Sequence, residues 1–109
     1  MSNEFEKGTK FSYRERIAYA EKSVVSKHIL KKATGNISLF AFDKGEGLSE
    51  HTAPFDALVH IVDGKADIVI DKVSNILDAG ESIVMPADVP HALKAVEKFK
   101  MVLTMIKSK

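Results

Sequence analysis

The 109-residue sequence contains no cysteine. This absence excludes disulfide bonds, thiolate metal ligands and cysteine nucleophiles, and it fits a reducing compartment. The sequence also lacks any run of about 18 apolar residues of the kind that spans a bilayer as a helix. The first ten residues are charged and have no apolar core of the kind found in signal peptides. We therefore expect a cytoplasmic protein without a membrane partner.

An excess of one charge is missing as well, since 16 Lys and Arg residues balance 15 Asp and Glu residues. The charges are scattered, and no basic stripe indicates a nucleic-acid partner. No glycine-rich phosphate loop precedes a helix, and no serine occupies a Gly-x-Ser-x-Gly turn. With 45% hydrophobic residues, the chain has the composition of one ordinary globular domain.

What the sequence does contain is apolar alternation with a period of two residues. In the segment KADIVID, Ala66, Ile68 and Ile70 fall on one face, as in a strand. The segment EKFKMVLTMI is similar, and its lysines alternate with larger apolar residues. These are Phe99, Met101, Leu103 and Met105. Both segments are predicted to be strands with one buried face and one partly wet face.

Five further segments are rich in β-branched or aromatic residues and are bounded by turn-forming residues. They are SVVSKHILKK, NISLFAFD, DALVHIVD, SNILDA and SIVMPA. Strand-length segments at a spacing of about ten residues predict an all-β sandwich or closed barrel. We expect Gly64 and Gly80 to bracket a hairpin where the chain reverses, and Asp88 to adopt a left-handed conformation.

One helix is predicted, at most, over Ser12 to Lys22. Ser12 is a possible N-cap, and Glu15 follows three residues later as in a capping box. The same segment fits an N-terminal arm that lies on a neighbouring subunit. The predicted organisation is therefore an arm or short helix over residues 1–22 and one β-barrel domain over residues 23–109.

Two glycine-led segments share a recognisable spacing. Gly45 is followed after five residues by His51, and this segment closes at Gly64. Gly80 is followed after five residues by Pro86, and His91 comes five positions after that proline.

These patterns resemble the two motifs of the cupin superfamily. The first family motif runs glycine, five residues, His-x-His, three or four residues, Glu, six residues and glycine. The second runs glycine, five residues, Pro-x-Gly, two residues, His, three residues and Asn. Six of the ten fixed positions agree in register, namely Gly45, His51, Gly64, Gly80, Pro86 and His91. The resemblance implies a double-stranded β-helix, which is a small jelly-roll barrel open at one end, and usually a homodimer.

The resemblance also raises the question of whether this chain has the side chains that bind a metal ion. In metal-bearing cupins, three histidines and a glutamate converge inside the barrel, and this ligand set suits iron, manganese, nickel, zinc or copper. His51 and His91 match two of these positions, but Ala53 stands at the second histidine position and Ala57 at the glutamate position. The first motif is therefore degenerate, and two protein ligands alone form a weak site.

A third metal ligand is conceivable in His60. If Ala57 faces the interior, alternation also turns Val59 and Ile61 inward and directs His60 outward. Only a bulge or a register change brings His60 inside.

Three functional hypotheses remain open at this point. In the first, the barrel binds a small molecule in an apolar pocket, to whose wall Val84 also contributes. Its predicted ligand-binding residues are His51, His91, Val59, Ile61, Phe40, Met85 and Met101. In the second, His51, His91 and His60 hold iron, manganese, nickel or zinc in a metal-dependent oxygenase or isomerase. In the third, the chain is a structural or interaction module, and the two histidines are incidental.

Overall fold

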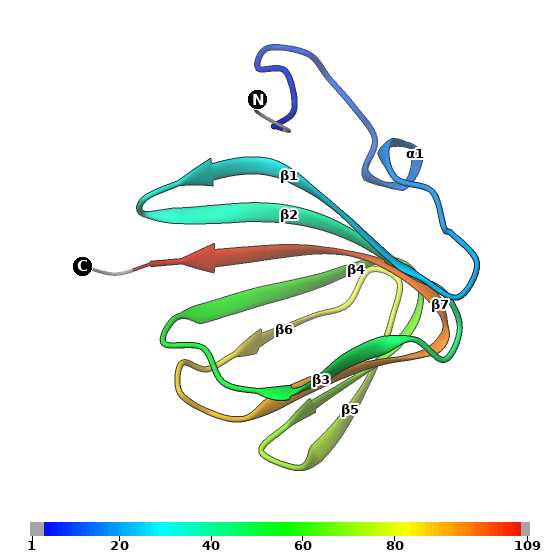
Figure 1. Ribbon diagram of the computed structural model, residues 1–109, viewed down its shortest axis with the longest axis vertical. Coiled ribbons are helices and arrows are strands. Elements are labelled where there is room, and N and C mark those ends of the chain that lie inside the picture. The colour runs from blue at the N-terminus through cyan, green and yellow to red at the C-terminus, as the bar shows by residue number, and fades with distance from the viewer. Residues whose placement is uncertain (1–3, 108–109) are drawn as a thin grey trace.

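Seven antiparallel strands follow one short helix in the computed structural model, which describes residues 4–107 (Figure 1). Residues 1–3 of the predicted arm and residues 108–109 of the predicted barrel lie outside this range. The elements are α1 (Tyr13–Arg16), β1 (Val24–Lys32), β2 (Gly35–Phe42), β3 (Gly47–His51), β4 (Asp56–Ile70), β5 (Val73–Asp78), β6 (Ser82–Met85) and β7 (His91–Ile106). The all-β prediction is confirmed.

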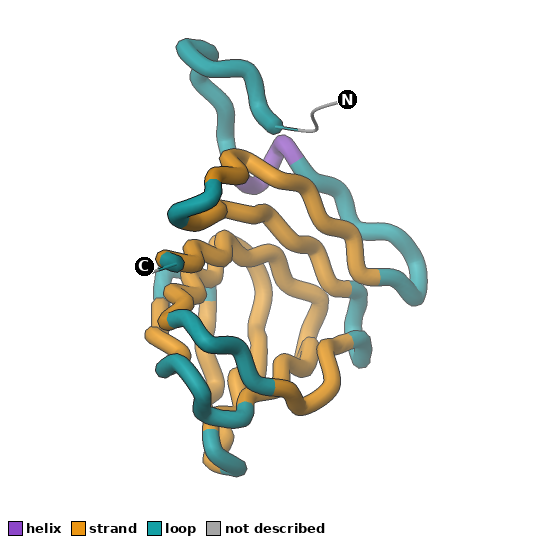
Figure 2. Tube along the Cα trace, turned by 60° about the vertical axis from the view of Figure 1, so that its left-hand side comes forward, coloured by secondary structure: helices purple, strands orange, loops and turns teal. Residues whose placement is uncertain are grey.

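A long ribbon made of β4 and β7 organises the barrel. The first half of β4 pairs with the second half of β7, and this part of the ribbon is extended by β6 on one side and by β2 and β1 on the other. The second half of β4 pairs with the first half of β7, and here β5 and β3 are the outer neighbours. The ribbon thus runs through both halves of one seven-stranded sheet, which curves around a common interior (Figure 2). This is the arrangement of a double-stranded β-helix.

The ribbon bends where the pairing of β4 with β7 shifts register, between Ile61 and Asp63 with the extra residue on β4, and between Gly64 and Ala66 with the extra residues on β7. Such bulges insert unpaired residues and increase the local twist. The segments DALVHIVD and KADIVID, predicted as separate strands, are therefore parts of one continuous strand. Gly64 has the expected positive φ of 83°, but it lies inside one continuous strand. The chain reverses at Asp71 and Lys72, between β4 and β5, so Gly64 and Gly80 bracket a hairpin as expected.

The barrel interior is filled by the residues that the alternation had placed on one face. Ala66, Ile68, Phe99 and Met101 are each 0% exposed, which confirms the face assignment. Phe42 stacks on Phe99 with ring centroids 4.4 Å apart and planes 9° from parallel. These side chains form the main core, which leaves room only toward one end of the barrel.

A second apolar cluster lies on the outer face of the sheet. The N-terminal arm places Phe5 and Ile17, which are 7% and 2% exposed, against Leu39 and Val102 on that face. Figure 1 shows the arm above β1 and β2, at the end of the molecule opposite β5. The arm segment 4–22 thus covers a face of the sheet that would otherwise expose apolar side chains.

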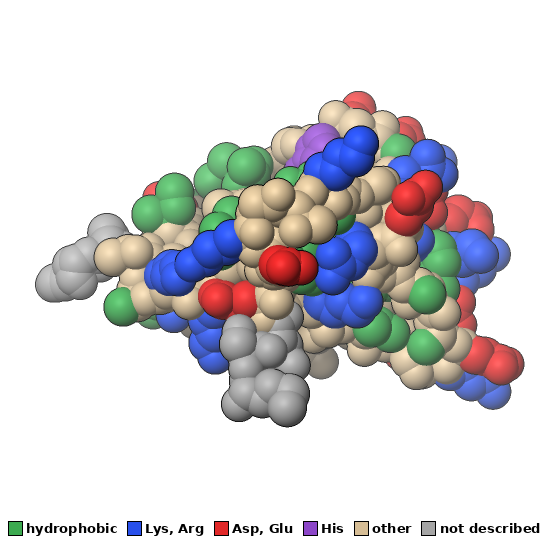
Figure 3. Space-filling view, turned by 90° about the horizontal axis from the view of Figure 1, so that it is seen from above, with side chains coloured by type: hydrophobic (Ala, Val, Ile, Leu, Met, Phe, Trp, Pro, Cys, Tyr) green, Lys and Arg blue, Asp and Glu red, His purple; other side chains and the backbone are tan. Residues whose placement is uncertain are grey.

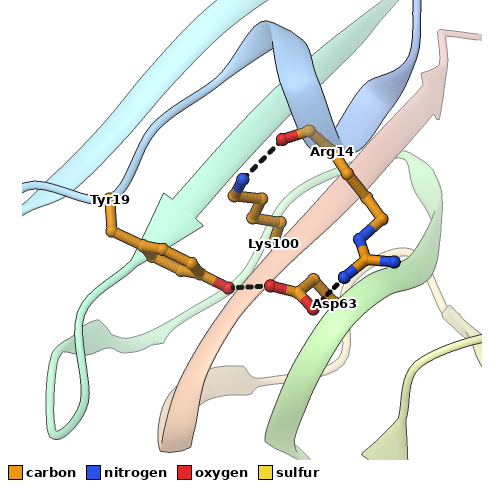
Figure 4. Close-up of polar contacts among 4 residues, drawn as sticks. All are labelled: Arg14, Tyr19, Asp63 and Lys100. Atoms are coloured by element: carbon orange, nitrogen blue, oxygen red, sulfur yellow. Dashed lines mark hydrogen bonds and ion pairs between the residues drawn. The ribbon is translucent and has the colours of Figure 1, made fainter.

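Polar contacts centred on Asp63 hold the arm in place (Figure 4). The Tyr19 hydroxyl donates a hydrogen bond of 2.6 Å to one carboxylate oxygen of Asp63, and Arg14 contacts the other oxygen at 3.2 Å. Lys100 donates to the backbone carbonyl of Arg14 at 2.5 Å. Burial and the bond to Asp63 both raise the pKa of Tyr19, so this phenol stays protonated and remains a donor.

The helix is shorter than predicted, since α1 ends at Arg16 rather than at Lys22. Ser12 is the N-cap residue but makes no side-chain capping bond, so one expected source of helix stability is missing. Ile17 is extended and 2% exposed, because it packs against the sheet. Tertiary burial of Ile17 therefore stops the helix after one turn.

Lys and Arg side chains on the face seen from above lie beside Asp and Glu side chains rather than in a stripe of one sign (Figure 3). Within residues 4–107, no helix has the length and apolar character that crossing a membrane requires.

Candidate functional site

His51 and His91 are neighbours at one end of the barrel. His51 is the last residue of β3 and His91 is the first residue of β7, and the two are paired directly across these strands. Their ring centroids are 4.4 Å apart, and the rings meet edge to face at 69°. The expectation that these two distant imidazoles lie side by side therefore agrees with the structure.

Backbone carbonyls fix the orientation of both rings. Nδ1 of His51 lies 2.7 Å from the carbonyl oxygen of Ser49, and Nδ1 of His91 lies 3.2 Å from that of Val89. Because a carbonyl oxygen can only accept, Nδ1 must carry the hydrogen in each ring. In the neutral form, each Nε2 then holds a lone pair, and neither Nε2 bonds to any residue in the described chain.

The environments of the two rings differ. His91 is only 6% exposed, whereas His51 is exposed to solvent. Burial is the largest cause that lowers the pKa of His91, and the nearby His51 lowers it further, although the Val89 carbonyl acts in the opposite direction. His91 is therefore held in its neutral form at physiological pH.

The histidines open onto a cavity of about 60 Å³. Its lining side chains are Leu48, His51, Ala53, Ala57, Met85, His91, Leu93, Met101, Leu103 and Met105. The lining includes all four positions at which the family motif would place metal ligands, namely His51, Ala53, Ala57 and His91. The spacing of the motif thus predicts which positions share the cavity, although two of them carry no donor atom.

The other predicted ligand-binding residues are divided between the cavity and the core. Met85 and Met101 line the cavity. Val59 and Ile61 face inward as predicted but are fully buried in the packed core, and Phe40 packs partly buried against that core. None of these three lines the cavity. Whether they affect ligand binding stays a prediction.

Val84 does not form part of the cavity wall as expected. It is 55% exposed on the outer face of β6, because the alternating position that faces inward on this strand is Met85. The cavity residues not predicted as ligand-binding are Leu48, Leu93, Leu103 and Met105. Leu103 and Met105 continue the alternating face of Met101, so their inward orientation could be predicted from the sequence. Their position along the barrel could not.

His60 lies outside the cavity. Its side chain contacts Ser82, with Nδ1 2.7 Å from the hydroxyl oxygen, and its partner across β7 is Val102, which belongs to the outer cluster. The register shifts between β4 and β7 begin only after Ile61, so they do not turn His60 inward. In the described part of the chain, no group of three or more His, Asp or Glu side chains is placed to hold a metal ion. The residues present therefore do not fit the metal set of three histidines and a glutamate.

Comparison with known proteins identifies a family. A family model described as a cupin domain matches residues 38–107. No curated protein gives a significant match.

Solved structures are similar over nearly the whole chain. A conserved protein of unknown function from Streptococcus pyogenes is 33% identical, with a TM-score of 0.91 and coverage of 96% of this chain and 92% of that chain. A cupin superfamily protein from Desulfitobacterium hafniense is 27% identical, with a TM-score of 0.87 and coverage of 98% and 97%. A cupin 2 conserved barrel domain protein from Leptotrichia buccalis is 40% identical with a TM-score of 0.86, and the match covers 89% of this chain but 47% of that longer chain.

Proposed function

The chain belongs to the cupin superfamily, and we propose that it binds a small molecule at the barrel end where His51 and His91 meet. The observation that carries this proposal is the pair of imidazoles, 4.4 Å apart, at the mouth of an otherwise apolar cavity. Apolar walls with a few convergent polar groups are the usual composition of a small-molecule site.

The tautomers of the histidines define the chemistry of the ligand. With Nδ1 of each ring donating to a backbone carbonyl, the two Nε2 atoms are left as acceptors. The matching group on a ligand is a hydrogen-bond donor, such as the hydroxyl of a phenol or an alcohol. A ligand that only accepts hydrogen bonds would leave the buried imidazole of His91 without a partner, which is costly.

The size of the cavity limits how much of the ligand enters it. Its volume of about 60 Å³ is well below the 300–1,000 Å³ typical of sites that enclose drug-sized molecules. The ligand is therefore expected to insert only a compact apolar end, and its hydroxyl group stays at the mouth beside the imidazoles. Phenol is a compact probe with these properties.

We expect phenol to raise the melting temperature of the protein, whereas its methyl ether, anisole, should not. Phenol donates a hydrogen bond and anisole does not, so the pair isolates the donor group. Replacing His91 with alanine removes one acceptor and should weaken phenol binding by about tenfold or more, since a hydrogen bond in an apolar site contributes about 1.4 kcal/mol. Thermal shift assays and isothermal titration measure both effects.

His60→Ala provides the matched control, because His60 is a histidine that faces away from the cavity. It should leave phenol binding unchanged. Equal shifts with phenol and anisole, or equal losses in the His60 and His91 variants, would contradict the proposal.

A metal-dependent enzyme of the usual family type is not the function that the site supports best. Ala53 and Ala57 line the cavity at two of the four ligand positions, and alanine has no donor atom. The donor chemistry of the chain thus favours a binding role over divalent-metal catalysis.

We further propose that the chain forms a homodimer through the outer face of β6, β4 and β7. Val84, Leu58 and Ile106 are 55%, 41% and 67% exposed on neighbouring strands of this face, with Val84 directly opposite Leu58. Exposed apolar surface that continues across several strands is typical of interaction sites.

Leu58→Glu is expected to convert the dimer to a monomer in sedimentation equilibrium, because it places a charge in the interface. Val73→Glu is the control, since Val73 is 61% exposed but lies on β5 away from this face. A protein that is monomeric before mutation would contradict the proposal.

A further inference from the structure

Methionine is concentrated at the cavity. The chain has four methionines, and three of them, Met85, Met101 and Met105, line the space into which His51 and His91 open. The fourth, Met1, lies outside the described residues. The proposed small-molecule site uses the imidazoles but assigns no role to these sulfur atoms.

Strand register places two of the thioethers around the position of the missing glutamate. Ala57 on β4 is paired directly with Met85 on β6 and with Met105 on β7. Directly paired residues project on the same face of a sheet, with Cβ atoms about 5 Å apart. The short side chain of Ala57 therefore leaves space between two methionines at the point where the family pattern places a carboxylate.

The cavity is small enough for several of its lining side chains to contact one bound ion. A volume of about 60 Å³ accommodates only a few water molecules, so side chains that line it lie around a common point. Those lining side chains that have donor atoms are two imidazoles and three thioethers, and the rest are apolar. Within the described residues, the lining contains no carboxylate.

This donor set has a clear preference among ions. Thioether sulfur and imidazole nitrogen are ligands that suit Cu(I), whereas carboxylate and water oxygen suit magnesium, calcium and manganese. The charge of the site also favours Cu(I). The site offers no anionic ligand to compensate an ion, and the cost of placing an uncompensated ion in an apolar environment grows with the square of its charge. A monovalent ion is therefore favoured over a divalent one.

We propose that His51, His91 and the cavity methionines bind one Cu(I) ion per chain. The lone pair of each Nε2 is available to the ion when the ring is neutral, because each Nδ1 hydrogen is already held by a backbone carbonyl, which is a common arrangement for metal-binding histidines. The thioether sulfur atoms of Met85 and Met105, which lie on either side of Ala57, complete the coordination. This inference goes beyond the proposed function, and neither depends on the other.

The test is an anaerobic titration of the full chain with Cu(I), in ascorbate, against a colorimetric Cu(I) chelator. We expect one ion per chain, and an X-ray absorption spectrum with both nitrogen and sulfur neighbours around copper. The double variant Met85→Leu/Met105→Leu should bind Cu(I) at least about tenfold more weakly, because it removes two of the donors. Leucine keeps the volume and apolar character of methionine, so the fold is retained.

His51→Ala should also weaken Cu(I) binding, by about a hundredfold, since the exposed His51 is a ligand whose loss does not disturb the core. His60→Ala is the control and should have no effect. Silver(I), which does not change oxidation state under these conditions, should reproduce the pattern of Cu(I).

Three results would overturn the inference: unchanged Cu(I) affinity in the leucine double variant, a copper spectrum without sulfur, or equal affinity for Zn(II) and Cu(I). The titration contains no organic ligand, so its outcome is independent of the phenol experiment. A phenol response without Cu(I) binding would remove this inference and leave the proposed function intact. Cu(I) binding without a phenol response would do the reverse.

Discussion

Replacing Gly64 with alanine is expected to lower the free energy of unfolding by more than about 4 kcal/mol, a loss few single substitutions cause. A Cβ atom at this position would lie 1.8 Å from the carbonyl oxygen of Lys98 and 2.7 Å from Cα of Phe99. Both contacts are with the backbone of β7, which cannot rotate away as a side chain would. The φ of +83° adds a further cost for any residue with a side chain.

Gly80→Ala separates these two costs. Gly80 has a similar φ of +94°, but a Cβ there would meet nothing within 4 Å. Its replacement should therefore cost only about 1–2 kcal/mol, which is the penalty for the left-handed conformation. Urea unfolding followed by circular dichroism measures both variants. Similar losses in the two would mean that β4 and β7 separate easily at the bend, contrary to the close approach at Gly64.

Gly64 connects the fold to the site through the direction of the side chains on β4. Before the bulges, odd-numbered positions such as Ala57 and Val59 face inward, whereas after them even-numbered positions such as Ala66 and Ile68 do so. The bend at Gly64 thus lets one strand contribute an inward face to both halves of the sheet. A disturbance there would displace the cavity position Ala57 relative to β7.

The strand faces and the pairing of the two histidines could be predicted from the sequence. Alternation decides which side of a strand a residue occupies, and it places Met101, Leu103 and Met105 correctly on the interior face. The motif spacing brings His51 and His91 to the same end of the barrel because both lie at strand ends that pair with each other. These are local patterns with a direct structural meaning.

The depth of a residue along the barrel could not be predicted in this way. Val59, Ile61 and Phe40 face inward or pack against the core, yet they lie beyond the cavity. Alternation has only two states and contains no information on distance from the open end. That information depends on the register of β4 against β7, which includes the two bulges.

Two other differences have a similar origin in tertiary structure. The turn-like composition around Gly64 separates two predicted strands, but β4 continues through this glycine because β7 pairs with β4 before and after it. The helix predicted after Ser12 stops at Arg16, since Ile17 is buried on the sheet and Tyr19 bonds to Asp63 in β4. Contacts between distant segments decide both cases, and no local pattern reports them.

The cavity itself provides a further prediction, namely that divalent-metal binding can be restored. The double variant Ala53→His/Ala57→Glu supplies the two missing ligand types at positions that line the same cavity as His51 and His91. We expect it to bind Zn(II) or Ni(II), with a melting temperature at least about 10 °C higher when the metal is at a hundred times its dissociation constant, since binding then contributes about 2.7 kcal/mol. The unmodified chain should show no comparable response.

Without metal, the same double variant should be less stable than the unmodified chain. Ala57 is 4% exposed between Met85 and Met105, so a glutamate there loses the hydration of its carboxylate. Metal coordination would compensate this cost, and differential scanning calorimetry with and without Zn(II) measures the two states. Ala53→His alone adds no buried charge and tests the three-imidazole set if the double variant does not fold.

The matched control places the same two residues outside the cavity. Thr52→His/Leu58→Glu carries them at adjacent positions whose side chains do not line the cavity, and Leu58 is 41% exposed. Compared with Leu58→Glu alone, which is itself expected to dissociate the dimer, this variant should gain no metal-dependent stabilisation. If it responded as strongly as the cavity variant, the restored metal binding would not depend on the barrel cavity. If neither responded, the backbone at 53 and 57 would not direct side chains toward the histidines, and the cavity would differ from a metal site by more than its two missing donors.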